Sequence, residues 1–421
     1  MKAFLEKLRA RLGDFWWYTL MIFLACRAAD ALNMFVGLWL VPRCVDMKEL
    51  GAVQPLTSFA SFLAIPASVL AITFLKEVNR LATRREFGKM KSLIRGVFIA
   101  TGVFLALAFV AAKLLLPVFL RRIRIEEGSL GLLILASAFI GAVAPVYTNA
   151  LQALKRFGSI SVLQILGAPI RLVTMIVAMP FRPLSGYFLG QAATPAFSIV
   201  AAMVMLRKDF AVAAETYWTK PIVRRLALVF LGMAGYQLAG SVVGLLEMTV
   251  LRENLPDVES GAYYMVTRFS DISAYVTCAL ITVLFPMTAE TAEKGGDTRP
   301  LVFKASLAQI AAGAILALAF VFAGKPLLAL LPGGANYSAY AWAIPAMIGV
   351  NTVSAIQTFH FNTEASAGRF SFLYLYIPLH LAFAAALAFV KIDSLGGMVV
   401  WFAVTNLARL AFALPGLFKR K

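Results

Sequence analysis

The chain has 421 residues, of which 61% are hydrophobic and only 14% are charged. A soluble domain is about 45–50% apolar and about 25% charged, so a soluble core cannot bury this excess. The composition excludes a soluble enzyme, a disordered chain and a nucleic-acid-binding module. The net charge is +18, from 39 Lys and Arg against 21 Asp and Glu, and in a membrane protein this balance is typical of basic cytoplasmic loops.

Long continuous apolar runs predict twelve membrane-spanning helices, because a helix needs about 20 apolar residues to cross a bilayer. Strands of a membrane barrel would instead alternate over about 10 residues. The predicted spans are residues 15–42, 50–75, 96–120, 129–154, 158–181, 183–206, 226–251, 260–289, 305–331, 336–362, 370–390 and 394–418. The predicted fold class is therefore an all-α polytopic membrane protein with no separate soluble domain.

The first span follows a basic segment and opens with Trp16, Trp17 and Tyr18. These aromatic residues are typical of an interfacial anchor. The apolar stretch is too long for a signal peptide and no small-x-small cleavage site follows it, so we expect an uncleaved first helix. The break between the fifth and sixth spans depends on Pro180 and Pro183 alone.

Basic residues predict the orientation. With the N-terminus inside, the inner segments hold 25 Lys and Arg, the outer segments and nearby helix ends hold 10, and four arginines remain inside spans. Cytoplasmic loops carry the excess of Lys and Arg, so we expect both termini in the cytoplasm and the chain in the inner (plasma) membrane. The one local exception is the predicted outer cluster of Arg121, Arg122 and Arg124.

An internal repeat divides the chain. Glu49-Leu50-Gly51 follows the first span and Glu259-Ser260-Gly261 follows the seventh, 210 residues later. The run LALAFV recurs with an offset of 211. An offset of six spans keeps the same sidedness, which predicts two parallel-related six-helix bundles. The predicted domains are residues 1–206, a basic cytoplasmic linker 207–225, and residues 226–421.

Charged residues inside the spans are the candidate site, because such charges are costly and usually face the bundle interior or a water-filled cavity. They are Arg27, Asp30, Arg171, Glu247, Arg268, Asp271 and Arg409. Two pairs repeat one spacing: Arg and Asp are three residues apart in both the first and the eighth span, on one helix face. Each pair is either a self-neutralised ion pair or a hydrated anion site, in which arginine offers its spare donors to phosphate.

The other charges leave more alternatives open. Arg171 and Arg409 are either central ligands or are satisfied by carbonyl groups beside Pro169 and Asn406. Glu247 lies toward the outer end of its span, where it is expected to meet the membrane interface. His380 is expected to be a neutral, satisfied histidine, with a proton relay as the alternative. Four arginines against three acids predict a neutral to cationic cavity. The sequence has no HExxH, GxSxG or Walker A motif, so we expect no enzyme, no cofactor and no metal.

The acidic turns around Glu49 and Glu259, the basic loop 150–157 and the basic loop 76–95 resemble those of the multidrug/oligosaccharidyl-lipid/polysaccharide exporter superfamily. The length is similar to its polysaccharide flippase branch, whereas the lipid II flippases of that superfamily usually have 14 helices. The resemblance implies two six-helix bundles and alternating access. It also implies cavity placements for Arg27, Asp30 and Arg268.

We therefore expect a flippase that exports an anionic polyprenyl-diphosphate-linked oligosaccharide for cell-surface polysaccharide biosynthesis. The expected partners are this lipid-linked glycan, membrane lipids, and a glycan polymerase or glycosyltransferases, with no nucleic acid. The alternatives are a lipid II flippase, a drug or cation antiporter of the same superfamily, or a non-transporting scaffold. In the antiporter, Asp30, Asp271 and Glu247 would be coupling residues.

Overall fold

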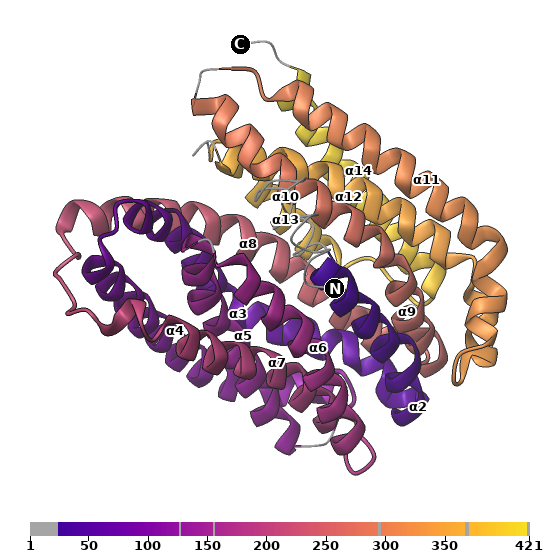
Figure 1. Cartoon of the computed structure of the whole chain (residues 1–421). Coiled ribbons are helices and arrows are strands. Elements are labelled where there is room, and N and C mark those ends of the chain that lie inside the picture. Colours follow the sequence, from indigo (N-terminus) through magenta and orange to yellow (C-terminus); the bar gives the residue numbers. More distant parts are fainter. Residues whose placement is uncertain (1–23, 126–127, 155, 294–295, 367–369, 419–421) are drawn as a thin grey trace, which may run out of the picture. The chain divides into compact units, whose positions relative to one another are not determined.

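The computed structural model describes residues 24–125, 128–154, 156–293, 296–366 and 370–418 (Figure 1). Within these ranges every regular element is a helix, so the prediction of an all-α fold is confirmed. The start of the first predicted span, with Trp16, Trp17 and Tyr18, lies outside the described residues.

The helices follow the predicted spans closely. The first described helix, Leu24–Cys44, contains a π-helical segment, η1 (Val36–Leu40), and ends as α2 (Val41–Cys44). The helices that follow are α3 (Met47–Thr83), α4 (Phe87–Arg122), α5 (Gly128–Ala153), α6 (Phe157–Ala178), α7 (Pro183–Leu206), α8 (Lys220–Asn254), α9 (Asp257–Ser270), α10 (Ile272–Glu293), α11 (Arg299–Ala329), α12 (Ala343–Ser366), α13 (Leu373–Ala386) and α14 (Leu395–Phe418).

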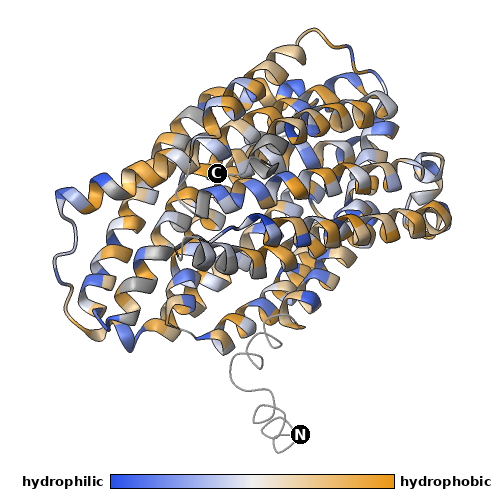
Figure 2. Cartoon of the chain, turned by 90° about the horizontal axis from the view of Figure 1, so that it is seen from above, coloured by the Kyte–Doolittle hydropathy of each residue, from blue (hydrophilic) through white to orange (hydrophobic). Residues whose placement is uncertain are grey.

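Nine helices of the described chain are long and apolar enough to cross a membrane, or ten with the bent pair formed by η3 (Gly334–Tyr340) and α12. The other predicted spans correspond to α13, which is shorter, and to the pair α9 and α10. Large apolar side chains such as Leu114, Phe322 and Phe389 are 74%, 76% and 88% exposed. Figure 2 shows apolar residues along most of the helices, as expected for surfaces that face lipid.

The eighth predicted span, residues 260–289, is not one continuous helix. It breaks at Asp271, between α9 and α10. The Ser270 and Ser273 hydroxyls donate to the carbonyls of Thr267 and Ser270, and such local bonds compete with regular helix geometry. The side-chain amide of Asn351 also donates to the Ser270 carbonyl, at 3.3 Å.

The turn between the fifth and sixth spans lies where the two prolines predict it. Helix α6 ends at Ala178 and α7 begins at Pro183, the first helical position that proline tolerates. Gly186 lies against this turn so closely that a β-carbon there would come within 2.5 Å of the Met179 nitrogen. Glycine is therefore required for the close approach.

The chain forms two compact units, which are described separately. Unit 1 comprises Met1–Cys44, Leu63–Val118 and Glu127–Leu231, and unit 2 comprises Val45–Phe62, Phe119–Glu126 and Gly232–Lys421. Unit 2 thus contains the first part of α3 and the end of α4 in addition to the C-terminal helices. The division at 207–225 that the repeat predicts stays a prediction.

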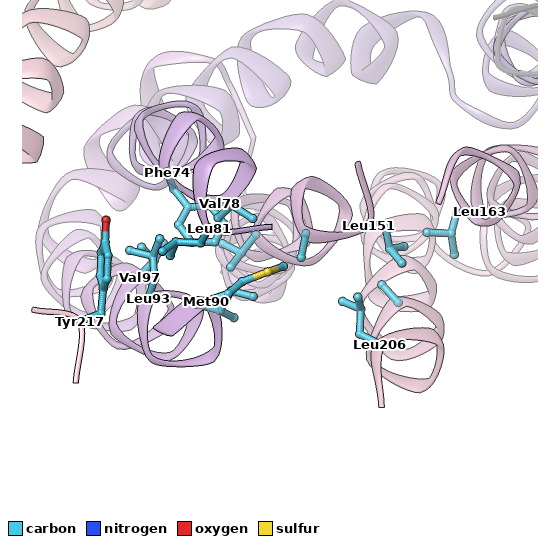
Figure 3. Close-up of a cluster of buried hydrophobic side chains, with 14 residues drawn as sticks. Phe74, Val78, Leu81, Met90, Leu93, Val97, Leu151, Leu163, Leu206 and Tyr217 are labelled. Carbon is cyan, nitrogen blue, oxygen red and sulfur yellow. The ribbon is translucent and has the colours of Figure 1, made fainter. Parts of the chain in front are cut away.

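A hydrophobic core in unit 1 joins α3 to α4. Figure 3 shows Phe74, Val78 and Leu81 facing residues of α4 such as Leu93 and Val97. The predicted linker lies against this pair of helices. Lys91 of α4 donates to the carbonyls of Phe210 and Val212 at 2.8 Å, and the Tyr217 hydroxyl donates to the Glu77 carboxylate of α3 at 2.7 Å. The last residues of the predicted linker are helical, since α8 begins at Lys220 with Pro221 in its first turn, where proline is compatible with a helix.

The orientation predicts where cysteine reagents react. Cys44 ends the first described helix and is partly exposed, and the charge distribution predicts that it lies on the outer side. An impermeant thiol reagent, added to intact cells with any outer membrane permeabilised, is expected to label Cys44 before Cys26 and Cys278. A Cys44→Ser variant is the control. Labelling that requires lysis of the inner membrane would show that the N-terminus is outside.

Candidate substrate-binding site

The predicted pair in the first span forms. The Arg27 guanidinium and the Asp30 carboxylate are 3.1 Å apart, and their side chains are 31% and 27% exposed. Three residues make nearly one helical turn, so the two side chains lie on the same face. The pair is thus neither fully buried nor fully solvated.

Arg171 of α6 belongs to the same neighbourhood of unit 1. Its Nη1 donates to the Asn33 side-chain oxygen at 2.9 Å, and Asn33 lies one turn beyond Asp30. Arg171 has no acidic partner in the described part of the chain, and its buried Nε has no hydrogen-bond acceptor there. Two arginines and one aspartate therefore lie in this part of unit 1, leaving an excess positive charge.

The predicted pair in the eighth span also forms. Arg268 and Asp271 approach to 3.2 Å, at the break between α9 and α10. Arg268 also donates to the side-chain oxygen of Gln54 on α3 at 2.8 Å, and its guanidinium lies over the Tyr264 ring at 5.3 Å. These contacts orient the planar guanidinium from three directions.

A second ion pair in unit 2 joins two residues of the candidate set. Arg409 on α14 lies 4.0 Å from Glu247 on α8, and the Trp401 indole donates to the same carboxylate at 2.9 Å. Both charged side chains are nearly buried, at 15% and 7% exposed. Arg409 therefore has Glu247 as its partner and not a carbonyl beside Asn406, and the Glu247 side chain is buried within unit 2.

The two ion pairs of unit 2 lie in one neighbourhood, since the buried Tyr263 is close to Glu247 of one pair and to both residues of the other. His380 is 1% exposed, and its Nδ1 contacts the Tyr376 carbonyl at 2.8 Å, so Nδ1 carries a proton.

The candidate residues are divided between the units. Unit 1 holds Arg27, Asp30 and Arg171, and unit 2 holds Glu247, Arg268, Asp271 and Arg409.

The sequence did not predict three residues that form hydrogen bonds with the candidate residues: Asn33, Gln54 and Trp401. Asn33 and Gln54 are 138 and 214 residues away from the arginines they accept from. Spacing along one helix cannot reveal such contacts. The available signal was an uncharged amide inside an apolar span, which must find a hydrogen-bond partner. Among the described residues no group of three or more metal-ligating side chains converges.

Comparison with known proteins gives a match of structure only. No protein-family model and no curated protein sequence matches the chain. A MATE transporter in complex with MaD5 has a TM-score of 0.66 at 12% identity, with 96% of each chain covered. A point mutant of the Vibrio cholerae MATE transporter VcmN has a TM-score of 0.65 at 15% identity and 98% coverage of both chains.

A third structure is described as the inward-facing conformation of a multidrug resistance MATE family transporter of the MOP superfamily. It has a TM-score of 0.60 at 15% identity and covers 94% of this chain and 93% of its own. The fold is that of the MATE transporters. At these identities the likeness concerns the fold, which hosts more than one function, and the substrate must be argued from the site.

Proposed function

We propose that the chain is a membrane exporter that works by alternating access and carries an anionic substrate, a polyprenyl-diphosphate-linked oligosaccharide. The lipid tail would stay in the bilayer while the diphosphate and glycan cross through the charged interior. In this proposal Arg27, Arg171 and Arg268 bind phosphate oxygens, and Asp30 and Asp271 hold two of these arginines in position. The protein would act in the plasma membrane beside the glycosyltransferases or polymerase that make and use the glycan.

One observation favours an anionic substrate over a cationic one. Each acid of the candidate set, Asp30, Glu247 and Asp271, has an arginine within 4.0 Å. A carboxylate neutralised in this way offers little to a cationic substrate. Arg171, in contrast, is held by an amide, so its charge is available to an anion. Arginine suits phosphate because its planar fork binds two oxygens at once.

A drug or cation antiporter is the second candidate, since the similar structures are those of MATE transporters, one of them described as a multidrug resistance protein. That function would require at least one of the three carboxylates to exchange its arginine for a cation or a proton. The two functions therefore differ in the charge of the ligand that binds at the arginines.

Binding by the purified protein distinguishes the two functions. We expect a polyprenyl diphosphate sugar to bind, an organic cation not to displace it, and Arg171→Gln to weaken binding by about tenfold, the loss of one charge-assisted interaction. Arg207→Gln is the matched control, because Arg207 is exposed just beyond α7. Saturable binding of the cation that excludes the diphosphate lipid would contradict the proposal and favour the antiporter.

A further inference from the structure

Arg252 is the largest side chain of the described residues that is fully buried. It lies near the end of α8, just past the seventh predicted span, and is one of the 10 basic residues that the predicted orientation assigns to the outer segments and nearby helix ends. Burying an arginine is costly unless its charge is paired and its donors are used. The contacts of Arg252 therefore indicate which parts of the structure this side chain holds together.

Its guanidinium joins three other helix ends within unit 2. Nη1 contacts the Asp257 carboxylate at 2.6 Å, at the start of α9. Nη2 donates to the Lys48 carbonyl at 2.8 Å, at the start of α3. Nε donates to the Ile123 carbonyl at 3.3 Å, just past the end of α4. One side chain thus connects segments from before and after the predicted linker.

Neighbouring residues reinforce the same junction. Arg124 donates to the Glu253 carbonyl at 2.6 Å and lies 3.7 Å from Asp257, and Arg122 lies 3.6 Å from Glu253. Arg124 has a φ of 61°, a left-handed conformation that favours glycine, so its contacts must offset that strain. The basic cluster 121–124, which departs from the predicted charge asymmetry, thereby acquires a structural role for two of its three arginines.

The two repeated acidic turns meet beside this junction. A β-carbon on Gly51 would come within 2.5 Å of the Ser260 β-carbon and 3.2 Å of Arg252 Nη1. Residues 49–51 and 259–261 are the segments related by the internal repeat. Helices α3 and α9 therefore approach as closely as their backbones allow, and the Arg252 side chain covers the contact.

We propose that Arg252 is a latch that holds the ends of α3, α4, α8 and α9 together on the predicted outer side, and that this latch must open during transport. In alternating access one bundle moves against the other around the substrate site. Lys48, Ile123, Arg252 and Asp257 all belong to unit 2, but their contacts join segments from the two halves of the sequence. If the halves that the repeat predicts move apart on this side, these contacts must break. The transport part of this inference rests on the proposed function.

The latch is tested by a cysteine at Ser260, in a chain whose three native cysteines are replaced by alanine. Ser260 is 1% exposed and its hydroxyl has no hydrogen-bond partner in the described residues, so Ser260→Cys is a mild change. In lipid nanodiscs, which expose both sides, maleimide should label this cysteine slowly. Adding Arg252→Gln should speed labelling by about tenfold or more, because the open population rises.

Two further variants separate opening from misfolding. Asp257→Asn keeps Arg252 and its two carbonyl acceptors, so an intermediate increase in labelling is expected. Arg121→Gln removes a charge from the same turn, but Arg121 is exposed and is the one arginine of the cluster to whose side chain the described residues give no contact at the junction. This control should stay within about twofold of the parent. Folded Arg252→Gln and Asp257→Asn proteins that both label at the parent rate would overturn the latch.

A bulky adduct tests the link to transport. Maleimide bound to Ser260→Cys would hold the α3–α9 contact open, because there is no room at Gly51 even for a β-carbon. We expect export to fall by about tenfold or more after labelling, with unlabelled Ser260→Cys protein as the control. Full-rate export by the fully labelled protein would overturn the requirement that this contact opens and closes during transport. The labelling measurement needs no substrate, so a failure of the proposed substrate leaves that result unaffected.

Discussion

Arg27→Ala and Arg268→Ala are each expected to weaken binding of a diphosphate head group by about 10- to 100-fold and to abolish glycan export at normal protein levels. Each substitution removes about 1.5–3 kcal/mol of charge-assisted hydrogen bonding. It also leaves Asp30 or Asp271 without the arginine that lies 3.1 or 3.2 Å away. The released carboxylate then repels the phosphates.

Lysine at either position should give an intermediate result, because it keeps the charge but loses the planar fork. For Arg268→Lys we also expect the contact with Gln54 to weaken, since one ammonium must serve both Gln54 and Asp271. Export is measured against protein level, with Arg207→Ala as the control outside the spans. If both alanine variants exported at the wild-type rate, the two pairs would be structural ion pairs only.

Arg409→Met is expected to destabilise the protein by about 3 kcal/mol, because it leaves the buried Glu247 carboxylate without its cation. The two side chains are 15% and 7% exposed, so solvent cannot replace the lost partner. Adding Glu247→Gln in the same chain should restore most of the stability, since the amide is neutral and can still accept from Trp401.

Thermal unfolding of the purified variants in one detergent measures these changes in stability. The single and double variants together form a double-mutant cycle, which gives the interaction between positions 409 and 247. Trp401→Phe is the control that removes the indole donor but leaves both charges. The ion-pair interpretation predicts that Arg409→Met alone is the least stable of the four combinations of these two positions. A stable Arg409→Met protein whose stability then depends on sodium or on pH would instead identify Glu247 as a cation site, as the antiporter requires.

Much of the fold was predictable because crossing a bilayer constrains each helix separately. The apolar run that ends before Pro180 and the new one that begins at Pro183 determine α6 and α7 without reference to any other helix. The break at Asp271 was not predictable from composition. It depends on local side-chain bonds and on the contact of Asn351 with the Ser270 carbonyl, 81 residues away.

The same distinction, between contacts within one helix and contacts between helices, applies to the candidate site. The spacing of Arg27 with Asp30, and of Arg268 with Asp271, predicts pairs on one helix face, and both pairs form. The contacts of Arg171 with Asn33 and of Arg409 with Glu247 join residues on different helices. The sequence did not point to Arg252 either, because the groups that accept from this fully buried side chain belong to three other helix ends.

The central claim is that an arginine-lined interior moves an anionic, lipid-linked head group across the membrane, and the most direct test is translocation in proteoliposomes. Vesicles would carry a polyprenyl diphosphate oligosaccharide, with a membrane potential, proton gradient or sodium gradient imposed in turn. An impermeant glycosidase outside reports head groups that arrive from the inner leaflet. We predict cleavage above the protein-free level for the wild type and close to that level for Arg171→Gln at equal incorporation. Cleavage at the protein-free level for the wild type under every gradient, or equal cleavage by both proteins, would contradict the account.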